Sequence, residues 1–248
     1  MSAVFFFVVA VLIARHRYTF NLKGLKYKTI WVEYPDIQRD VYEKYQLPPS
    51  DFKPVPNGGG DTFDYYSLPV IHDPSTGKTI ADSFHIALYL DETYPSTPRV
   101  IHDETYGLYN AFSDHIFVAL IPYLSTLMMP RMARMLNEYS QEWFIRARSG
   151  DVGAPLMELQ PKTPEALEVA WKHSEEAWGK GAKWYKPGAM FLSGSDRPGL
   201  ADFMIVSCFH NVRLGWGEDS KEWKNALQWQ GGKWKALSEY FAQYEQML

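Results

Sequence analysis

The chain has 248 residues, of which 46% are hydrophobic and 22% are charged, and its formal net charge is −4. This length suits one large or two modest globular domains, and the composition fits disordered, collagen-like and coiled-coil classes poorly. The small acidic surplus gives no sign of a nucleic-acid partner or of an anionic membrane surface. The single cysteine, Cys208, excludes an internal disulfide and an all-cysteine zinc site, which favours a cytoplasmic protein.

An apolar run of twelve residues, 3–14, opens the chain and is followed by Arg15, His16 and Arg17. The run is shorter than the roughly 20 residues that a membrane-spanning helix needs. A signal peptide carries its basic residues ahead of the apolar stretch, so the reversed order disfavours export. Unbroken Val, Phe and Ile are typical of a strand buried on both faces, which is our prediction. The alternative is a membrane-anchored interaction module with this run exposed.

The segments that follow alternate between strand and helix patterns up to residue 95. Gly24 ends a short helical pattern, and Asp36 is placed to cap the next one. Ser83 is placed to cap a third, which Pro95 stops. The predicted elements are a helix at 15–23, a strand at 26–34, a helix at 36–46, a mobile loop rich in Pro and Gly at 48–61, strands at 68–72 and 78–81, and a helix from 83.

Strand patterns fade after residue 95, and long helical patterns replace them. We therefore predict an α/β domain at residues 1–95, a linker at 96–103 and an all-helical domain at 104–248. The predicted helices of the second domain lie within 104–135, where Pro122 and Pro130 should kink or end them, at 163–184 with Pro164 in the first turn, in a buried segment from Pro198, and at 231–248.

The order of the first-domain elements, with Leu68-Pro69-Val70-Ile71 at the third strand, resembles a thioredoxin-like domain. That resemblance implies a cis peptide bond before Pro69. In such a bond the preceding residue, Leu68, turns its backbone N–H and C=O toward an extended peptide ligand.

The segment 81–95 begins with Ala81-Asp82-Ser83, with Ser83 fourteen residues beyond Pro69, and it resembles the acid–serine motif of glutathione transferases. The resemblance implies that the helix N-terminus and Ser83 receive the γ-glutamyl carboxylate of glutathione, while Asp82 holds the glutamyl ammonium. An Asp–Ser pair alone is more often an ordinary cap, but its spacing from Pro69 makes the combination specific. Leu68, Pro69, Asp82 and Ser83 are therefore the predicted glutathione-binding residues.

The second domain carries a matching structural motif in the segment 191–203. The resemblance places Asp202 at the start of the central helix, where its carboxylate reaches back over the helix N-terminus as in a capping box. Gly199 stands where Ser or Thr is usual, which implies a cap weaker by about a few tenths of a kcal/mol.

More narrowly, the segment 23–37 resembles fungal class A glutathione transferases, which are related to bacterial lignin β-etherases. This resemblance implies a homodimer that uses glutathione as co-substrate to conjugate or cleave aromatic or phenolic electrophiles in detoxification. We expect an aromatic pocket beside the sulfur, lined by residues among Tyr109, Phe112, Phe117, Tyr123 and Met128. Taken individually, each of these residues is more typical of a hydrophobic core.

The hydroxyl that would activate the glutathione thiol is missing from its expected place. The family's serine aligns with Ala10, and the nearby hydroxyls of Ser2, Tyr18 and Thr19 are poorly placed, so no catalytic residue is assigned. The alternative function is therefore a catalytically impaired protein of the same fold that binds glutathione or aromatic ligands.

The remaining reactive side chains are more typical of structural or surface positions than of a functional site. The seven histidines lack metal-ligand spacing, so no metal site is expected, and His85 is typical of a helix surface. Cys208 lies in an apolar helical run and is expected to be a buried, inert thiol. Lys44 and Lys53 could reach the glycine carboxylate of glutathione, although solvated surface lysines are the more common case.

Overall fold

A four-stranded sheet forms the core of the first domain. The structure is a computed structural model that describes residues 3–8, 14–54, 62–101 and 105–246. The strand order is β2-β1-β5-β6, with β1 and β2 parallel and the other neighbours antiparallel. The strands are β1 Val4–Val8, β2 Tyr27–Trp31, β5 Val70–Asp73 and β6 Lys78–Ala81, and the two helices beside them are α1 Ala14–Lys23 and α2 Ser83–Thr93.

The opening apolar run supplies a central strand, as predicted. Alternate side chains of β1 face opposite sides of the sheet, so Phe6 packs with Phe20 of α1 and Leu90 of α2, while Phe7 joins the larger core on the other side. Both faces of β1 are therefore covered. This arrangement confirms the thioredoxin-like α/β domain expected from the sequence.

A buried ion pair holds α1, α2 and the following segment together. Lys23 Nζ lies 2.6 Å from Asp91 Oδ1, and both side chains are fully buried. The same carboxylate accepts hydrogen bonds from Val100 N at 3.0 Å and Ile101 N at 2.8 Å. Both carboxylate oxygens of Asp91 therefore have partners, and its buried negative charge is compensated by Lys23 and two backbone N–H groups.

The segment after β2 differs from its prediction. In place of one α-helix capped by Asp36, the chain forms a 3₁₀ turn, η1 Tyr34–Asp36, and then a π-helical turn, η2 Gln38–Glu43. The turn starts at Tyr34, two residues before Asp36, and Pro35 lies at its beginning, where the fixed φ of proline is favourable. Asp36 is thus inside the turn, where its carboxylate pairs with Arg39 instead of capping.

The predicted loop 48–61 is also partly wrong. Its described part contains a strand, β3 Asp51–Pro54, which pairs antiparallel with β4 Thr62–Tyr65; residues 55–61 lie outside the described residues. The Pro and Gly residues of this segment favoured the prediction of a loop. Hydrogen bonds to β4 nevertheless pair the backbone groups of the segment as a strand. The hairpin is at the surface, where the side chain of Phe52 is 61% exposed.

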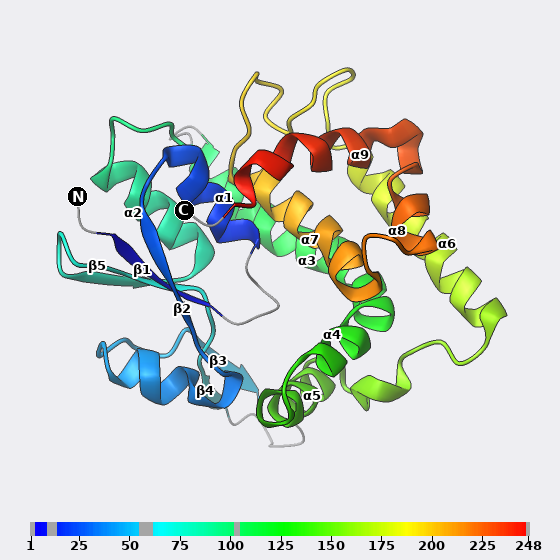
Figure 1. The fold of residues 1–248 in the computed structure, drawn as a ribbon, viewed down its shortest axis with the longest axis horizontal. Helices are drawn as coiled ribbons and strands as arrows, with labels where there is room; N and C mark the ends of the chain where they lie inside the picture. Colours follow the sequence, from blue (N-terminus) through cyan, green and yellow to red (C-terminus); the bar gives the residue numbers. More distant parts are fainter. Residues whose placement is uncertain (1–2, 9–13, 55–61, 102–104, 247–248) are drawn as a thin grey trace.

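The second domain is helical, as predicted, and stands beside the sheet in Figure 1. Pro122 does not end a helix, because α3 continues through it, whereas Pro130 lies in the first turn of α4. Within the described ranges no helix is long and apolar enough to cross a membrane. The helices are α3 Tyr106–Leu127, α4 Met129–Met135, α5 Glu138–Val152, α6 Pro164–Ala182, α7 Leu200–Trp216, α8 Lys221–Ala226 and α9 Trp229–Phe241, with short 3₁₀ turns η4 Leu156–Glu158 and η5 Ala242–Tyr244.

Helix α7 is the buried centre of this domain, and its N-terminus has the predicted acidic cap. Asp202 accepts hydrogen bonds from Gly199 N at 3.0 Å and from Leu192 N at 2.8 Å. Gly199 is required by space, because a Cβ atom there would lie 2.6 Å from Tyr109 Oη and 3.2 Å from Val100 O. The absent Ser or Thr is therefore the consequence of a close contact with α3.

We predict that Gly199→Ser lowers the free energy of unfolding by about 1–3 kcal/mol, although serine is the better cap, because the site is overpacked. Tyr109→Phe removes the closest atom and should relieve part of that cost. Urea unfolding of both single variants and the double variant measures the coupling, which we expect to exceed about 1 kcal/mol. Strictly additive effects would rule out this steric explanation.

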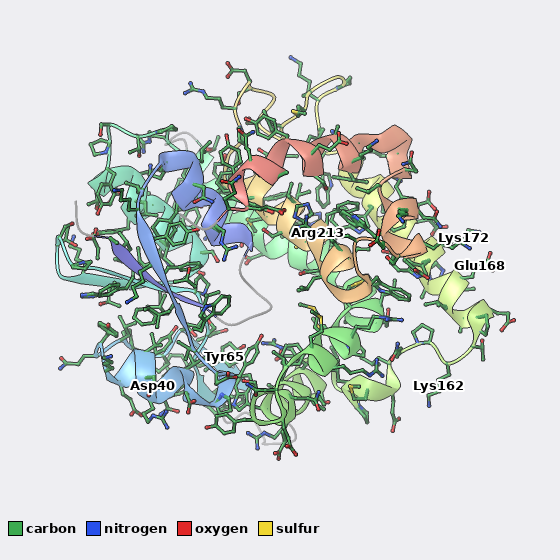
Figure 2. The ribbon with its side chains drawn as sticks, in the orientation of Figure 1. Asp40, Tyr65, Lys162, Glu168, Lys172 and Arg213 are labelled. Carbon is green, nitrogen blue, oxygen red and sulfur yellow. The ribbon has the colours of Figure 1, made fainter. Side chains whose placement is uncertain are left out.

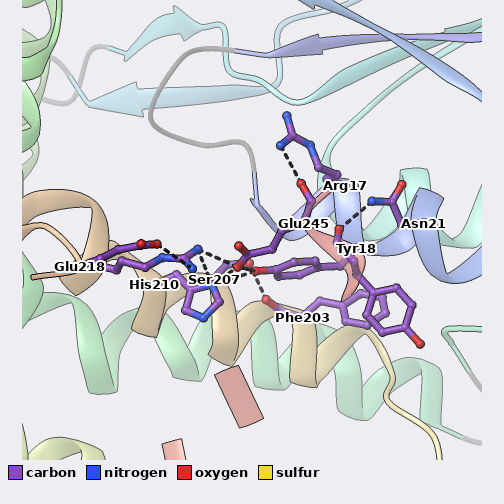
Figure 3. A network of polar contacts seen from close by, with 10 residues as sticks. Arg17, Tyr18, Asn21, Phe203, Ser207, His210, Glu218 and Glu245 are labelled. Atoms are coloured by element: carbon purple, nitrogen blue, oxygen red, sulfur yellow. Dashed lines mark hydrogen bonds and ion pairs between the residues drawn. The ribbon is translucent and has the colours of Figure 1, made fainter. Parts of the chain in front are cut away.

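The C-terminal segment ties the two domains together through Glu245 (Figure 3). Its carboxylate lies 2.6 Å from Arg213 Nη2 and 3.0 Å from His210 Nδ1, both on α7. On the α1 side, Tyr18 Oη donates to the same carboxylate at 3.4 Å, and Arg17 donates to the Glu245 backbone carbonyl at 3.2 Å. Burial tends to raise the pKa of Glu245, but the hydrogen bonds from His210 and Arg213 outweigh it and lower that pKa to about 2.

We predict that Glu245→Gln destabilises the protein at pH 7 by on the order of 2 kcal/mol. Because the folded-state pKa lies below the unfolded value, this contribution is present above pH 4.5 and is lost as the pH falls toward about 2. Thermal unfolding between pH 2 and 8 should show the two proteins converging in acid. The matched control is Glu239→Gln, whose exposed ion pair with Lys235 should contribute no measurable difference; a gap that stays constant with pH would contradict the assignment.

Candidate functional site

The two predicted glutathione motifs meet at one edge of the β5–β6 hairpin. Val70 pairs with Ala81 across the hairpin, and just beyond this pair Asp82 N donates a hydrogen bond to Pro69 O at 3.2 Å. The peptide bond between Leu68 and Pro69 is cis, as predicted. Pro69 and Asp82, thirteen positions apart in the sequence, thus become neighbours. We call Leu68, Pro69, Asp82 and Ser83 the hairpin edge.

Asp82, and not Ser83, is the N-cap of α2. Its Oδ1 accepts hydrogen bonds from Phe84 N at 2.9 Å and His85 N at 3.2 Å, and Ser83 is the first helical residue. The prediction that Ser83 caps the helix was wrong by one position. The backbone of Asp82 has φ +74° and ψ 138°, which is rare for a residue other than glycine. Such backbone strain is concentrated at binding sites.

The charges of the hairpin edge suit the zwitterionic end of an amino acid. The N-terminus of α2 is the positive end of the helix dipole, which favours a carboxylate. The side chain of Asp82 is 56% exposed, so its carboxylate remains accessible to an ammonium group while it caps the helix. His85 is 63% exposed, as predicted for a surface histidine, and its Nδ1 lies 3.3 Å from Asp82 Oδ1.

The peptide before Leu68 is held by a residue that the sequence did not single out. Tyr42, buried at the end of η2, donates a hydrogen bond from Oη to Ser67 O at 2.7 Å. Ser67 Oγ in turn donates to Ser50 Oγ at 3.1 Å. Burial raises the pKa of Tyr42, so its hydroxyl stays protonated and can donate. No local pattern links position 42 to position 67.

The position expected for the thiol-activating group follows β1 in the sequence. Strand β1 runs antiparallel to β5, with Phe7 opposite Val70, and ends at Val8. Ala10 and Ser2 lie outside the described residues. Tyr18 is fully buried and its hydroxyl contacts His210 Nδ1 at 2.9 Å, while Thr19 is 2% exposed. Neither hydroxyl is available to a bound thiol.

The expected aromatic residues are only partly described. Tyr109 and Met128 are buried in the main core, and the Phe112 ring packs edge-on against Trp184, with 5.5 Å between centroids. The side chains of Phe117 and Tyr123 lie outside the described part.

The other reactive residues that the sequence singled out lie as follows. Lys44 Nζ stands 5.6 Å from the ring centroid of Tyr45, and the side chain of Lys53 is outside the described part. Cys208 is buried, as predicted. Among the described residues no group of three or more His, Cys, Asp or Glu side chains could hold a metal.

A separate groove of about 720 Å³ lies between α6, α8 and the start of α9. Figure 2 shows two of its residues, Glu168 and Lys172, far across the molecule from Asp40 and Tyr65 of the first domain. The groove contains none of the hairpin-edge residues. Its lining residues are Pro164, Leu167, Glu168, Trp171, Lys172, Glu175, Lys221, Glu222, Asn225 and Trp229.

Comparison with known proteins gives a consistent assignment for both domains. Residues 14–93 match the N-terminal domain model of glutathione S-transferases, and residues 107–244 match the C-terminal domain model. The chain is 30% identical over 240 residues to the glutathione S-transferase-like protein ustS of Aspergillus flavus, covering 89% of this chain and 79% of that protein.

Solved structures of fungal proteins are similar over nearly the whole chain. Two glutathione S-transferases of Ceriporiopsis subvermispora, both crystallised with glutathione, are 37% and 32% identical with TM-scores of 0.88; the first match covers 99% of this chain and 98% of the other, and the second 97% and 98%. A glutathione transferase of Phanerochaete chrysosporium is 32% identical with a TM-score of 0.86, and the match covers 99% of each chain. Together with the two domain matches, these similarities show that the chain belongs to the glutathione S-transferase family.

Proposed function

We propose that the chain is a glutathione transferase that binds glutathione at the hairpin edge and directs its thiolate at aromatic or phenolic electrophiles. The hydrogen bond from Asp82 N to Pro69 O carries this proposal, because it keeps the two halves of the binding motif together. Two relatives at 32% and 37% identity were crystallised with glutathione, which supports the same ligand here.

Each half of the hairpin edge has a distinct role. The backbone of Leu68 pairs with the cysteinyl residue of glutathione, since among the described residues no hydrogen bond uses its N–H or C=O. The N-terminus of α2 and Ser83 receive the γ-glutamyl carboxylate, and Asp82 holds the ammonium group. In the reaction the thiol proton passes to solvent, a sulfur–carbon bond forms, and the bond to the leaving group breaks as halide or phenolate departs.

We predict that Asp82→Asn weakens glutathione binding about tenfold, because it removes a charge-assisted hydrogen bond to the ammonium. Asparagine caps helices as well as aspartate and tolerates positive φ, so the free energy of unfolding should stay within about 0.5 kcal/mol of the parent value. Calorimetric titration gives the dissociation constant. Glu92→Gln, an exposed residue near the other end of α2, is the control and should change neither quantity. Unchanged binding in Asp82→Asn would refute this role.

The alternative function is a glutathione- or aromatic-binding protein with impaired catalysis. The burial of Tyr18 and Thr19 favours it, because neither hydroxyl can reach a bound thiol. Retention on immobilised glutathione, followed by an assay with an activated aryl halide, separates the two. Retention with turnover supports the transferase, and retention without turnover supports the binding protein. Failure to be retained would reject both.

The oligomeric state is inferred from exposed apolar side chains at the start of α3. We propose a homodimer, because Leu108 and Tyr106 at the start of α3 expose 70% and 44% of their surface and a second copy would cover them. Sedimentation equilibrium distinguishes the dimer from a monomer.

The single cysteine remains the reason to expect the cytoplasm, where we place a role in detoxification.

A further inference from the structure

We propose that Tyr42 is a positioning residue for glutathione: its hydrogen bond to Ser67 O orients the peptide whose N–H, at Leu68, pairs with the ligand. This inference rests on the proposed function and extends it to a residue outside the hairpin edge. It concerns a side chain from a different element, 25 positions earlier in the sequence.

The geometry of one peptide plane carries the inference. The carbonyl oxygen of Ser67 and the N–H of Leu68 belong to the same peptide group, which is planar and trans, so they point in opposite directions. Fixing the oxygen by the 2.7 Å bond from Tyr42 therefore fixes the direction of the Leu68 N–H. The ligand then meets a donor that is already oriented and loses less entropy on binding.

The π-helical turn brings Tyr42 to this position. Its backbone carbonyl accepts from Leu47 N at 2.9 Å, five residues ahead, in place of the bond four residues ahead that an α-helix forms. Only 1% of Tyr42 is exposed, and its ring packs edge-on against Tyr66, with 5.1 Å between centroids. Single π-helical turns are often found at functional sites.

A second polar contact holds the same peptide segment. Ser67 Oγ donates to Ser50 Oγ, which donates to Tyr65 O at 2.8 Å. The segment before Leu68 is thus anchored through the Ser67 carbonyl by Tyr42 and through the Ser67 side chain by the β3–β4 hairpin. Because the ring of Tyr42 is packed independently of its hydroxyl, the hydroxyl can be removed without opening a large cavity.

The test compares Tyr42→Phe with Tyr66→Phe. Both changes remove one phenolic hydroxyl from adjacent rings, but the hydrogen bond of Tyr66 Oη among the described residues is to Asp64 Oδ2, at 3.3 Å on the surface. Calorimetric titration with glutathione, at a temperature where all proteins are fully folded, should show binding about 3- to 10-fold weaker in Tyr42→Phe and unchanged in Tyr66→Phe. Protection of the Leu68 amide from hydrogen exchange by saturating glutathione should fall only in Tyr42→Phe.

Three results would overturn the inference. Glutathione binding within twofold of the parent in Tyr42→Phe would do so, as would equal weakening in both variants. If the parent chain binds no glutathione, the proposed function fails and this inference fails with it. Ser50→Ala provides a second variant, which should weaken glutathione binding less than Tyr42→Phe does, because Ser50 bonds the Ser67 side chain and not the Ser67 carbonyl.

Discussion

The hydrogen bond from Asp82 N to Pro69 O is the contact on which the candidate site depends. It forms because β5 and β6 are paired in a register that sets Val70 opposite Ala81. A shift of that register by one residue would move Asp82 away from Pro69 and turn the alternate side chains of both strands to the other face of the sheet. The same apolar packing that buries β5 therefore places the polar residues of the hairpin edge.

The two domains are joined at several places, and polar groups act at each. Glu245 connects α1 with α7. Ser140 of α5 accepts a hydrogen bond from Tyr34 N at 3.0 Å, and the ring of Tyr34 stacks on Trp143, with 5.2 Å between centroids. The hairpin edge thus belongs to a domain whose helix α1 and turn η1 are both braced by the helical domain. These contacts restrict the motion of the site before a ligand binds. The entropy lost on binding is therefore smaller.

The sequence predicted the parts of the fold that rest on local patterns. The buried strand at the start and Thr163 and Pro164 at the start of α6 follow from neighbouring residues. The acidic cap of Asp202 was expected from the family resemblance, and the structure has it. It failed where contacts between separate segments decide, at the β3–β4 hairpin and at the bond from Tyr42 to Ser67. It also predicted an α-helix where the chain forms a π-helical turn. The cap of α2 was misplaced by one residue, because Asp and Ser are equally good N-caps.

The most direct measurement is a crystal structure of this chain with bound glutathione. The cysteinyl backbone should pair with Leu68, the γ-glutamyl carboxylate should lie at the N-terminus of α2, and its ammonium should contact Asp82. Glutathione bound away from the hairpin edge, or an empty edge in crystals grown at saturating glutathione, would contradict the assignment of this site.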